Sequence, residues 1–193
     1  MTAKPILILS GIALMSGVAC CSVINGRVEC KDSHGGCDAV VYLTNVPGAF
    51  KAGDSPLIDQ YRMEFTPHIL PVLVGTTVRI RNSDPTIHNV YTPSKAGDFF
   101  NLGTWAQGLI KTYTFKQPGE VRLLCNVHPR MEAWILVFSN PCFTKTGSDG
   151  SYSLRDVPPG RYELRVWHEK LKFNPVQVLA PPDGEVAINV TSQ

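Results

Sequence analysis

The sequence predicts an all-β protein built from two β-sandwiches, and three observations support this class. Turn-forming residues are abundant, with 16 Gly and 15 Pro among 193 residues, while only 18% of residues are charged. Apolar residues occur in short runs that are separated by Gly, Pro, Asn and Asp, as expected for strands joined by turns. Beyond the first 20 residues, no segment carries a helical repeat of three turns. The length is sufficient for a sizeable core and a second small domain.

The first half of the mature chain contains five β-rich runs. They span residues 23–28, 39–43, 63–65, 69–74 and 78–81. In the last run Val78 and Ile80 alternate with Arg79 and Arg81. This period of two predicts a strand with one buried face and one solvated face.

Three further runs surround one short loop. They span residues 111–115, 121–125 and 133–138. Pro118-Gly119 predicts a turn before the second run, and the loop of residues 125–131 lies between the second and third. Strands at both ends would hold this loop stiffly.

A second β-rich region follows Asn140-Pro141. Its predicted strands span residues 151–154, 161–166, 176–179 and 185–190. The turn Ser148-Asp149-Gly150 precedes the first of them, and the turn Val157-Pro158-Pro159-Gly160 separates the first from the second. This pattern predicts a second sandwich in the region 139–193.

Residues 1–20 have the features of an export signal. Lys4 precedes an almost wholly apolar run from Ile6 to Val18, which is too short to span a bilayer comfortably. The sequence that ends at Cys20 also resembles a bacterial lipoprotein box, in which Cys20 would be lipidated; cleavage by an ordinary signal peptidase is the alternative. Either route predicts an exported, periplasmic protein, either soluble or tethered to a bacterial membrane through Cys20.

Export would place the cysteines where disulfides persist. Cys30 and Cys37 flank a turn-like stretch and are candidates for a small disulfide loop, although Cys142 is an alternative partner for either. There is no Cys-x-x-Cys-His motif, which argues against a c-type cytochrome.

Residues 125–131 are the most informative stretch of the chain. Cys125, His128 and Met131 follow one another with two residues between each pair, and His88 supplies a second imidazole upstream. One thiolate, two imidazoles and a weaker thioether form the ligand set of mononuclear blue-copper sites. The sequence therefore predicts one type 1 copper ion bound by His88, Cys125, His128 and Met131.

From about Tyr61 to Phe138 the chain resembles the cupredoxin family, the group of plastocyanin, azurin and amicyanin. The resemblance rests on Met63-x-Phe65-x-Pro67, residues 75–82, His88-Asn89-Val90 and the Pro118-Gly119 turn before the ligand loop. It implies a Greek-key β-sandwich over residues 60–138 and the same four copper ligands. It also implies that the side chain of Asn89 joins the two ligand loops. Ala133 stands where the family has Gly.

Two flanking regions resemble carboxypeptidase regulatory-like, or transthyretin-like, β-sandwich domains. The resemblance rests on Asp149-Gly150-x-Tyr152-x-Leu154 and on the 157–162 turn region, together with strands at 24–28 and 39–43. It implies a discontinuous sandwich formed by residues 22–50 and 139–193, into which the copper domain is inserted. Docking or spacing is the expected use of such a domain.

Several other residues have simpler explanations than function. A second metal site from His34, His68 and His168 is disfavoured, and Trp105 and Trp134 are interpreted as packing residues. Asp84 and Glu132 are interpreted as surface charges near the ligand loop rather than as general bases. The arginines of the last sandwich are interpreted as its solvated face; they are Arg155, Arg161 and Arg165.

The predicted function is electron transfer by an exported copper protein. A redox partner protein is expected to dock transiently near His128, where Pro129 and Arg130 lie, and such encounters bury less than about 1,200 Å². The alternative is a periplasmic protein that binds and delivers copper without shuttling electrons. Catalysis is disfavoured because the chain has no His-x-His pair and no second cysteine near Cys125. An adhesive or scaffolding role is disfavoured by the complete ligand set. The net charge of +2, without a Lys/Arg cluster, argues against nucleic acid.

Overall fold

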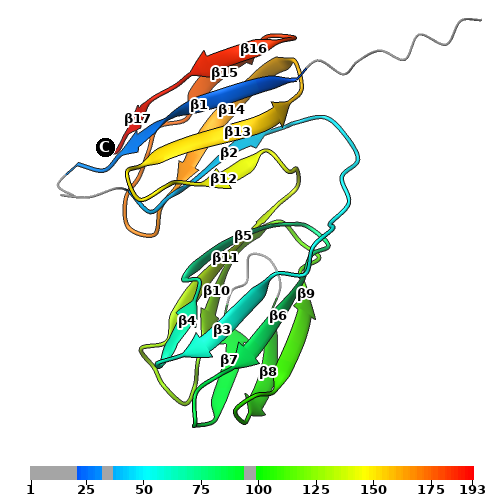
Figure 1. Ribbon diagram of the computed structural model, residues 1–193, viewed down its shortest axis with the longest axis vertical. Coiled ribbons are helices and arrows are strands. Elements are labelled where there is room, and N and C mark those ends of the chain that lie inside the picture. Colours follow the sequence, from blue (N-terminus) through cyan, green and yellow to red (C-terminus); the bar gives the residue numbers. More distant parts are fainter. Residues whose placement is uncertain (1–20, 32–36, 94–98) are drawn as a thin grey trace, which may run out of the picture.

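The computed structural model describes residues 21–31, 37–93 and 99–193, and within these ranges every regular element is a β-strand (Figure 1). The predicted all-β class is confirmed. Two predictions, the export signal and lipidation of Cys20, lie outside the described residues, as does His34. No helix with the length and apolar character needed to cross a bilayer occurs in the described ranges.

One sandwich, which we call the terminal sandwich, combines strands from both ends of the described chain. Its strands are β1 (Ser22–Glu29), β2 (Val40–Thr44), β12 (Phe143–Lys145), β13 (Ser151–Val157), β14 (Gly160–Trp167), β15 (Val176–Ala180), β16 (Gly184–Ala187) and β17 (Val190–Thr191). One sheet has the order β13-β1-β16, with β17 also paired to β1, and the other has the order β12-β2-β14-β15. Strands before residue 50 therefore pair with strands after residue 140.

The other sandwich, which we call the central sandwich, lies between these two halves in the sequence. Its strands are β3 (Leu57–Tyr61), β4 (Glu64–Thr66), β5 (Ile69–Leu73), β6 (Thr77–Asn82), β7 (His88–Thr92), β8 (Phe100–Trp105), β9 (Ile110–Thr114), β10 (Gly119–Leu124) and β11 (Glu132–Phe138). The sheets have the orders β5-β11-β10-β7-β8 and β4-β3-β6-β9. Figure 1 shows the two sandwiches at opposite ends of an elongated molecule.

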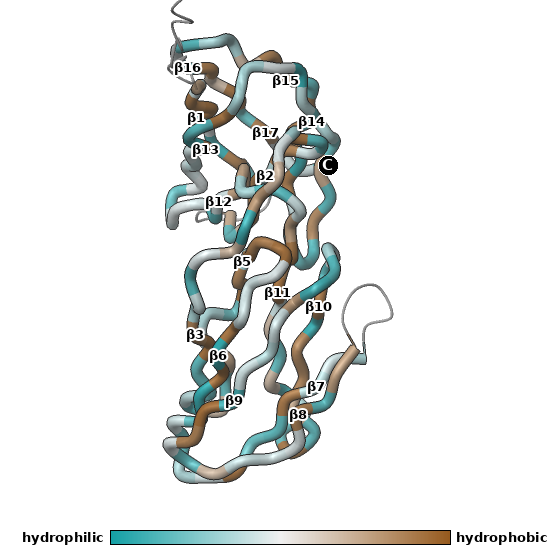
Figure 2. The backbone as a smooth tube through the Cα atoms, turned by 90° about the vertical axis from the view of Figure 1, so that its right-hand side faces the viewer, coloured by the Kyte–Doolittle hydropathy of each residue, from teal (hydrophilic) through white to brown (hydrophobic). Residues whose placement is uncertain are grey.

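Burial follows the alternation that the sequence predicted for several strands. In β6 Val78 and Ile80 are fully buried, whereas Arg79 is exposed. Figure 2 shows the same change between apolar and polar residues along many strands. The strand β11 is different, because Ile135 and Leu136 are both buried, on opposite faces. One face packs into the central core and the other packs toward the terminal sandwich.

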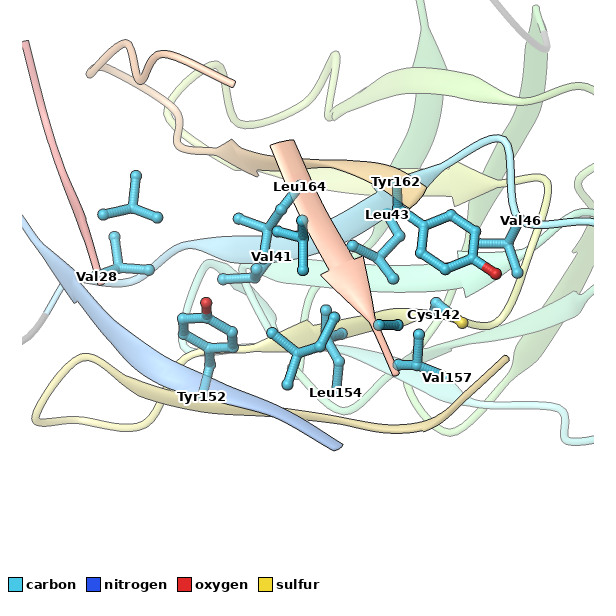
Figure 3. Packing of buried hydrophobic residues seen from close by; sticks show 14 of the residues in the cluster. Val28, Val41, Leu43, Val46, Cys142, Tyr152, Leu154, Val157, Tyr162 and Leu164 are labelled. Carbon is cyan, nitrogen blue, oxygen red and sulfur yellow. The ribbon is translucent and has the colours of Figure 1, made fainter. Parts of the chain in front are cut away.

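Each sandwich has its own apolar core. Figure 3 shows part of the terminal core, in which Leu43, Leu154 and Leu164 meet between the two sheets. The central core contains Phe115 and Leu123 and extends to Cys125 and Met131. The ligand loop of residues 125–131 is therefore attached to a packed core at both of its ends.

A small third cluster joins the sandwiches. Val40 of the terminal sandwich packs with Ile69 and Leu136 of the central one, and Phe138 and Trp167 lie against them. Close to this cluster, the imidazole Nε2 of His68 lies 2.9 Å from the carboxylate of Glu169, which follows β14. The two sandwiches are thus in direct contact through apolar and polar groups.

Four strands were not predicted, and each has a physical reason. They are β3, β7, β8 and β12. The strand β3 contains the buried polar residue Gln60, and β7 begins with the buried residues His88 and Asn89, so neither shows apolar alternation. The strand β8 contains Gly103, which has a φ of 69°, and β12 has only three residues.

Candidate metal centre

Three neighbouring strands bring the predicted ligands to one end of the central sandwich. His88 begins β7, Cys125 follows the last residue of β10, and Met131 precedes the first residue of β11. Because β10 pairs with both β7 and β11, the loop between β10 and β11 lies beside the start of β7. Residues that are about 40 positions apart in the sequence therefore become neighbours.

Three of the four predicted ligands converge on one point. The Nδ1 of His88 lies 3.9 Å from the Sγ of Cys125 and 2.9 Å from the Nδ1 of His128. One ligand atom from each residue lies within 4.8 Å of the others. A cation with bonds of about 2.0–2.3 Å holds its ligand atoms roughly 3.3–3.8 Å apart. The distance of 2.9 Å between the two nitrogens is shorter than this range, and the nitrogen–sulfur distance of 3.9 Å is slightly longer. The three side chains could close around one transition-metal ion with small shifts.

Met131, the fourth predicted ligand, lies at the end of the ligand loop that enters the core. Its side chain is buried with 1% exposure in the same cluster as Cys125. Its backbone N–H donates to the carbonyl oxygen of His128 at 3.0 Å, which tightens the end of the loop. This hydrogen bond links the backbone of Met131 to the backbone of His128.

The tautomer of the neutral His88 ring is set by a buried carboxylate. The Nε2 of His88 lies 2.8 Å from the Oδ2 of Asp84, and both side chains are almost fully buried. Because a carboxylate accepts a hydrogen bond, Nε2 carries the proton in the neutral ring. The lone pair is then on Nδ1, which faces Cys125 and His128. This is the tautomer that a metal ligand requires.

Asp84 is not a surface charge, so that interpretation was wrong. It has 4% exposure, and its two carboxylate oxygens accept the backbone N–H groups of Arg62 and Met63 at 2.6 and 2.9 Å. Burial by itself would raise the pKa of the Asp84 carboxyl, but the hydrogen bonds from Met63, His88 and Arg62 outweigh this effect and lower the pKa. Asp84 therefore stays ionised inside the protein.

The turn held by Asp84 forms part of the rim of the site. Arg62 and Met63 have φ values of 57° and 61°, a left-handed conformation that costs most residues about 1–2 kcal/mol each. Both line a surface hollow of about 500 Å³ that also contains His128. The remaining lining residues are Glu64, Val127, Pro129, Arg130 and Met131. A strained turn beside a binding site is a common sign of function.

Asn89 connects the two segments that carry the ligands. Its Oδ1 accepts the backbone N–H of Asn126, the residue after Cys125, at 3.4 Å. Its Nδ2 donates to the carbonyl oxygen of Gly103 and to the side chain of Asn101, each at 2.9 Å. The amide therefore joins the start of β7 to the ligand loop and to β8.

Among the described cysteines outside the metal centre, two form a bridge. Cys30 and Cys37 are joined by a disulfide, so Cys142 is not the partner of either. The Cys142 thiol is buried, and burial raises its pKa to about 11. This thiol stays protonated and behaves as an apolar core group.

The other residues considered from the sequence take structural positions. Glu132 forms an ion pair with Arg122 at the surface, and Trp105 is buried in the central core. His68 Nδ1 lies 3.1 Å from the carbonyl oxygen of Glu132, while His168 lies beside the disulfide, so these two imidazoles do not share a site.

Sequence reasoning missed Asp84 as part of the site, although a signal was present. Asp84 stands four residues before His88 and two after Asn82. Asn82 Oδ1 accepts the backbone N–H of Asp84 at 3.0 Å, and its Nδ2 donates to the carbonyl oxygen of Thr86 at 2.8 Å. An Asn-x-Asp turn before an imidazole is thus a local pattern that folds a carboxylate back onto the ring.

The fold and the site together define an all-β protein with a His–Cys–His cluster suited to a transition metal, in which His88 and Cys125 are buried. A family model, that of the β-sandwich domain of ER membrane protein complex subunit 7, matches residues 127–189, which is less than half of the chain. No curated protein sequence matches the chain.

Solved structures that resemble part of the chain include three copper proteins. A copper-containing nitrite reductase from Thermus scotoductus is 25% identical, with 49% of this chain and 25% of that chain covered and a TM-score of 0.43. A purple cupredoxin from Nitrosopumilus maritimus is 25% identical over 44% of this chain and 100% of its own, with a TM-score of 0.39. A methionine-to-alanine mutant of amicyanin in the Cu(I) form is 21% identical over 51% of this chain and 98% of its own, with a TM-score of 0.41. All three TM-scores are below 0.5, and the metal centre is therefore inferred from the side-chain geometry of this chain.

Proposed function

We propose that this protein is an exported electron carrier with one type 1 copper ion bound by His88, Cys125, His128 and Met131. The observation that carries the proposal is the convergence of one nitrogen of each imidazole and the thiol sulfur within 4.8 Å. Copper bound to a thiolate and two imidazoles supplies a one-electron couple between Cu(II) and Cu(I).

The protein contributes a rigid framework to this chemistry. His88 and Cys125 are held by the packed core, and the hydrogen bonds of Asp84 and Asn89 fix the ring and the loop. Ligands that cannot rearrange keep the geometry similar in both oxidation states, which favours fast electron transfer over substrate turnover. This rigidity supports a carrier rather than an enzyme.

The proposed partner docks over the ligand loop, where His128 reaches the surface hollow. Exposed apolar side chains lie beside each histidine ligand: Ile87 precedes His88 and Val127 precedes His128, with exposures of 51% and 38%. Met63, with 48% exposure, lines the same hollow as His128. A small apolar surface of this kind suits a transient redox encounter.

The test is an optical and electron paramagnetic resonance spectrum of the copper-loaded mature protein. The wild type should show intense thiolate-to-copper absorption in the visible range, and Cys125→Ser should abolish it. Cys142→Ser is the matched control, because it removes another buried thiol that lies in the terminal core. A blue spectrum that survives in Cys125→Ser would refute the site, and copper binding without any such spectrum would favour the delivery alternative.

The axial role of Met131 is tested separately. Met131→Leu conserves the buried volume, so it should retain copper and cost less than about 1.5 kcal/mol of stability. Loss of the thioether should raise the reduction potential, because the axial ligand tunes it. Protein-film voltammetry measures this shift, and Met63→Leu controls for loss of a thioether at the rim. An unchanged potential in Met131→Leu would show that Met131 is not axial.

A further inference from the structure

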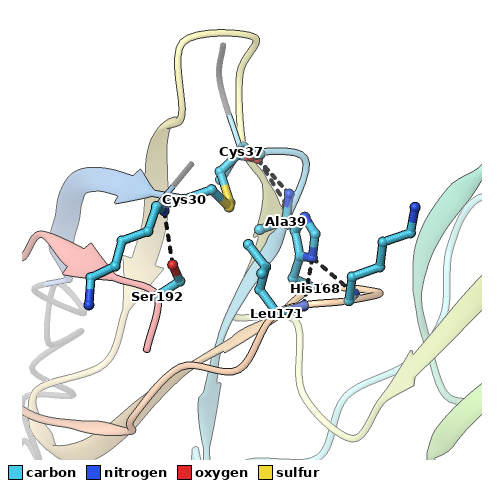
Figure 4. Close-up of a disulfide and its surroundings, with 9 residues drawn as sticks. Cys30, Cys37, Ala39, His168, Leu171 and Ser192 are labelled. Carbon is cyan, nitrogen blue, oxygen red and sulfur yellow. Dashed lines mark hydrogen bonds between the residues drawn. A yellow bond between two sulfur atoms is a disulfide. The ribbon is translucent and has the colours of Figure 1, made fainter. Parts of the chain in front are cut away.

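A second cluster of sulfur and nitrogen lies in the terminal sandwich, away from the metal centre. Cys30 follows β1, Cys37 precedes β2, and His168 follows β14. A ring nitrogen of His168 lies within 4.8 Å of both sulfur atoms of the disulfide. Figure 4 shows the imidazole beside the bridge, between the segments that carry Ala39 and Leu171.

The backbone decides which nitrogen of His168 carries a proton. The backbone N–H groups of Lys170 and Leu171 both donate to Nδ1, each at 3.1 Å. Nδ1 is therefore the acceptor, and in the neutral ring Nε2 carries the hydrogen. Burial lowers the pKa of His168 in spite of the nearby Asp38 and Glu169 carboxylates, which favours this neutral form.

This tautomer disfavours metal binding at Nε2 and favours an anion there. A metal at Nε2 would need a lone pair there and a proton on Nδ1, which the two backbone donors oppose. An N–H group at Nε2 instead suits an anion. A thiolate within reach of this N–H group would gain a hydrogen bond and a lower pKa.

We propose that Cys30, Cys37 and His168 form a thiol–disulfide exchange site, in which the imidazole N–H stabilises the thiolate released when the bridge opens. The reaction partner is a thiol pair, either in a small dithiol or in a redox protein. The site is independent of the copper centre and does not require it.

Burial gives the exchange a direction. Cys37 has 2% exposure and belongs to the terminal core, whereas Cys30 is partly exposed. A partner thiolate therefore attacks the sulfur of Cys30, the S–S bond breaks, and Cys37 leaves as the thiolate that His168 stabilises. A lower pKa of the leaving thiol makes this step faster.

The electrons and protons balance over two steps. The first step forms a mixed disulfide between Cys30 and the partner, and the second partner thiol then attacks the partner's own sulfur and releases Cys30. The dithiol is oxidised to a disulfide, and the bridge is reduced to two thiols that take up the two protons. In the reverse direction a partner disulfide is the oxidant that reforms the bridge.

Charged groups around the cluster largely cancel. Asp38, next to Cys37, forms an ion pair with Lys145 at 3.0 Å. Glu169 and Lys170 have opposite effects on His168, and Glu169 is itself paired with His68. The imidazole N–H is therefore the specific feature that separates this bridge from an ordinary structural disulfide.

The experiment measures reduction of the bridge in the full-length protein by dithiothreitol at pH 7. Alkylation and peptide mass spectrometry report Cys30 and Cys37 separately from the other cysteines. His168→Leu should slow reduction by about three- to tenfold. It should also return the thiol pKa of reduced Cys37, measured from the pH profile of alkylation, to about 8.5 or above from a lower value in the wild type. His168→Gln keeps an N–H near the same position and should recover part of the rate.

Two controls separate this role from a merely structural one. His68→Gln removes an imidazole that contacts neither sulfur and should leave the rate unchanged. Circular dichroism reports whether His168→Leu is folded. If this variant is unfolded, the thiol pKa of reduced Cys37 in the wild type tests the proposal instead. Equal rates in wild type and folded His168→Leu, or a wild-type Cys37 pKa at or above about 8.5, would overturn the proposal.

Discussion

Asp84 shows how one buried side chain can serve both a ligand and the surface above it. Its carboxylate accepts hydrogen bonds from the Nε2–H group of His88 and from the backbone N–H groups of Arg62 and Met63. An ionised group in this position is stable because three donors surround it, and charge-assisted hydrogen bonds are stronger than neutral ones. The orientation of a metal ligand and the shape of the strained turn at the rim therefore depend on the same residue.

We expect Asp84→Asn to weaken both metal binding and folding. The neutral amide accepts more weakly, and its NH2 group would face a donor in a buried site, so stability should fall by about 2–4 kcal/mol. Metal affinity should fall roughly 10–100-fold, as for other partners of ligating histidines. Urea unfolding of the metal-free protein and competitive copper titration measure the two effects.

Glu132→Gln is the matched control for Asp84→Asn. Glu132 also lies next to a predicted ligand, but its partner Arg122 is at the surface. Removal of such a pair should cost less than about 1 kcal/mol and leave copper affinity unchanged. Equal effects of the two substitutions would show that Asp84 has no special link to His88.

Some residues of the metal centre could be predicted from the sequence and others could not. The spacing of Cys125, His128 and Met131 pointed to one loop, because the pattern is local and its residue types are soft ligands. The role of Asp84 was not predicted, since its hydrogen bonds to residues 62 and 63 depend on how β3 and β6 pair. Charge alone does not reveal whether a carboxylate is buried.

At the scale of elements, β1 is shaped by a close approach of the chain at residue 188. Gly26 lies opposite Tyr152 in the sheet, and the hydroxyl of Tyr152 donates to the carbonyl oxygen of Ile188 at 2.7 Å. A Cβ on Gly26 would lie 1.7 Å from that same oxygen. Glycine in the middle of this strand is therefore required by space rather than by backbone conformation.

We expect Gly26→Ala to destabilise the protein by about 3 kcal/mol or more, because backbone must move to admit the methyl group. Thermal unfolding followed by circular dichroism measures the loss. Gly53→Ala is the control, since nothing lies within 4 Å of its added Cβ, and its stability should stay within about 1 kcal/mol of wild type. A Gly26→Ala protein as stable as the control would mean that the chain near residue 188 is not packed against β1.

Strands with regular alternation could be read from the sequence, whereas strands that carry functional or buried polar groups could not. The strand β6 alternates because one face meets the core and the other meets water. In β7 the first three residues are all buried, because His88 faces the site and Asn89 bonds to the ligand loop. Apolar–polar alternation did not predict the strands around the metal centre, because polar side chains are buried there to bind or orient groups rather than to pack the core.

At the scale of the whole molecule, the two sandwiches are connected twice along the chain and once more through side chains. Chain connections run from β2 to β3 and from β11 to β12. The apolar cluster of Val40, Ile69 and Leu136 lies between the sandwiches, and the His68–Glu169 pair lies nearby. His68 also contacts the carbonyl oxygen of Glu132, one residue after Met131. A partner that binds the terminal sandwich would therefore be physically connected to the ligand loop.

The contribution of the His68–Glu169 contact to stability should depend on pH, and Glu169→Gln tests this. The hydrogen bond from His68 is the largest cause that lowers the pKa of the Glu169 carboxyl below its usual value. A carboxyl with a lowered folded-state pKa stabilises the fold above its ordinary pKa of about 4.3, and this contribution is lost as the pH falls through the folded-state pKa.

In metal-free protein, Glu169→Gln should therefore reduce the free energy of unfolding by about 0.5–1 kcal/mol at pH 7, a modest value because both side chains are partly exposed. The difference from wild type should shrink as the pH falls below about 4. Urea titrations at pH 7, 5 and 3 measure it, and Glu163→Gln, which removes an ion pair within the terminal sandwich, is the control. If the Glu169→Gln deficit were the same at all three pH values, ionisation of Glu169 would not stabilise the contact between the sandwiches.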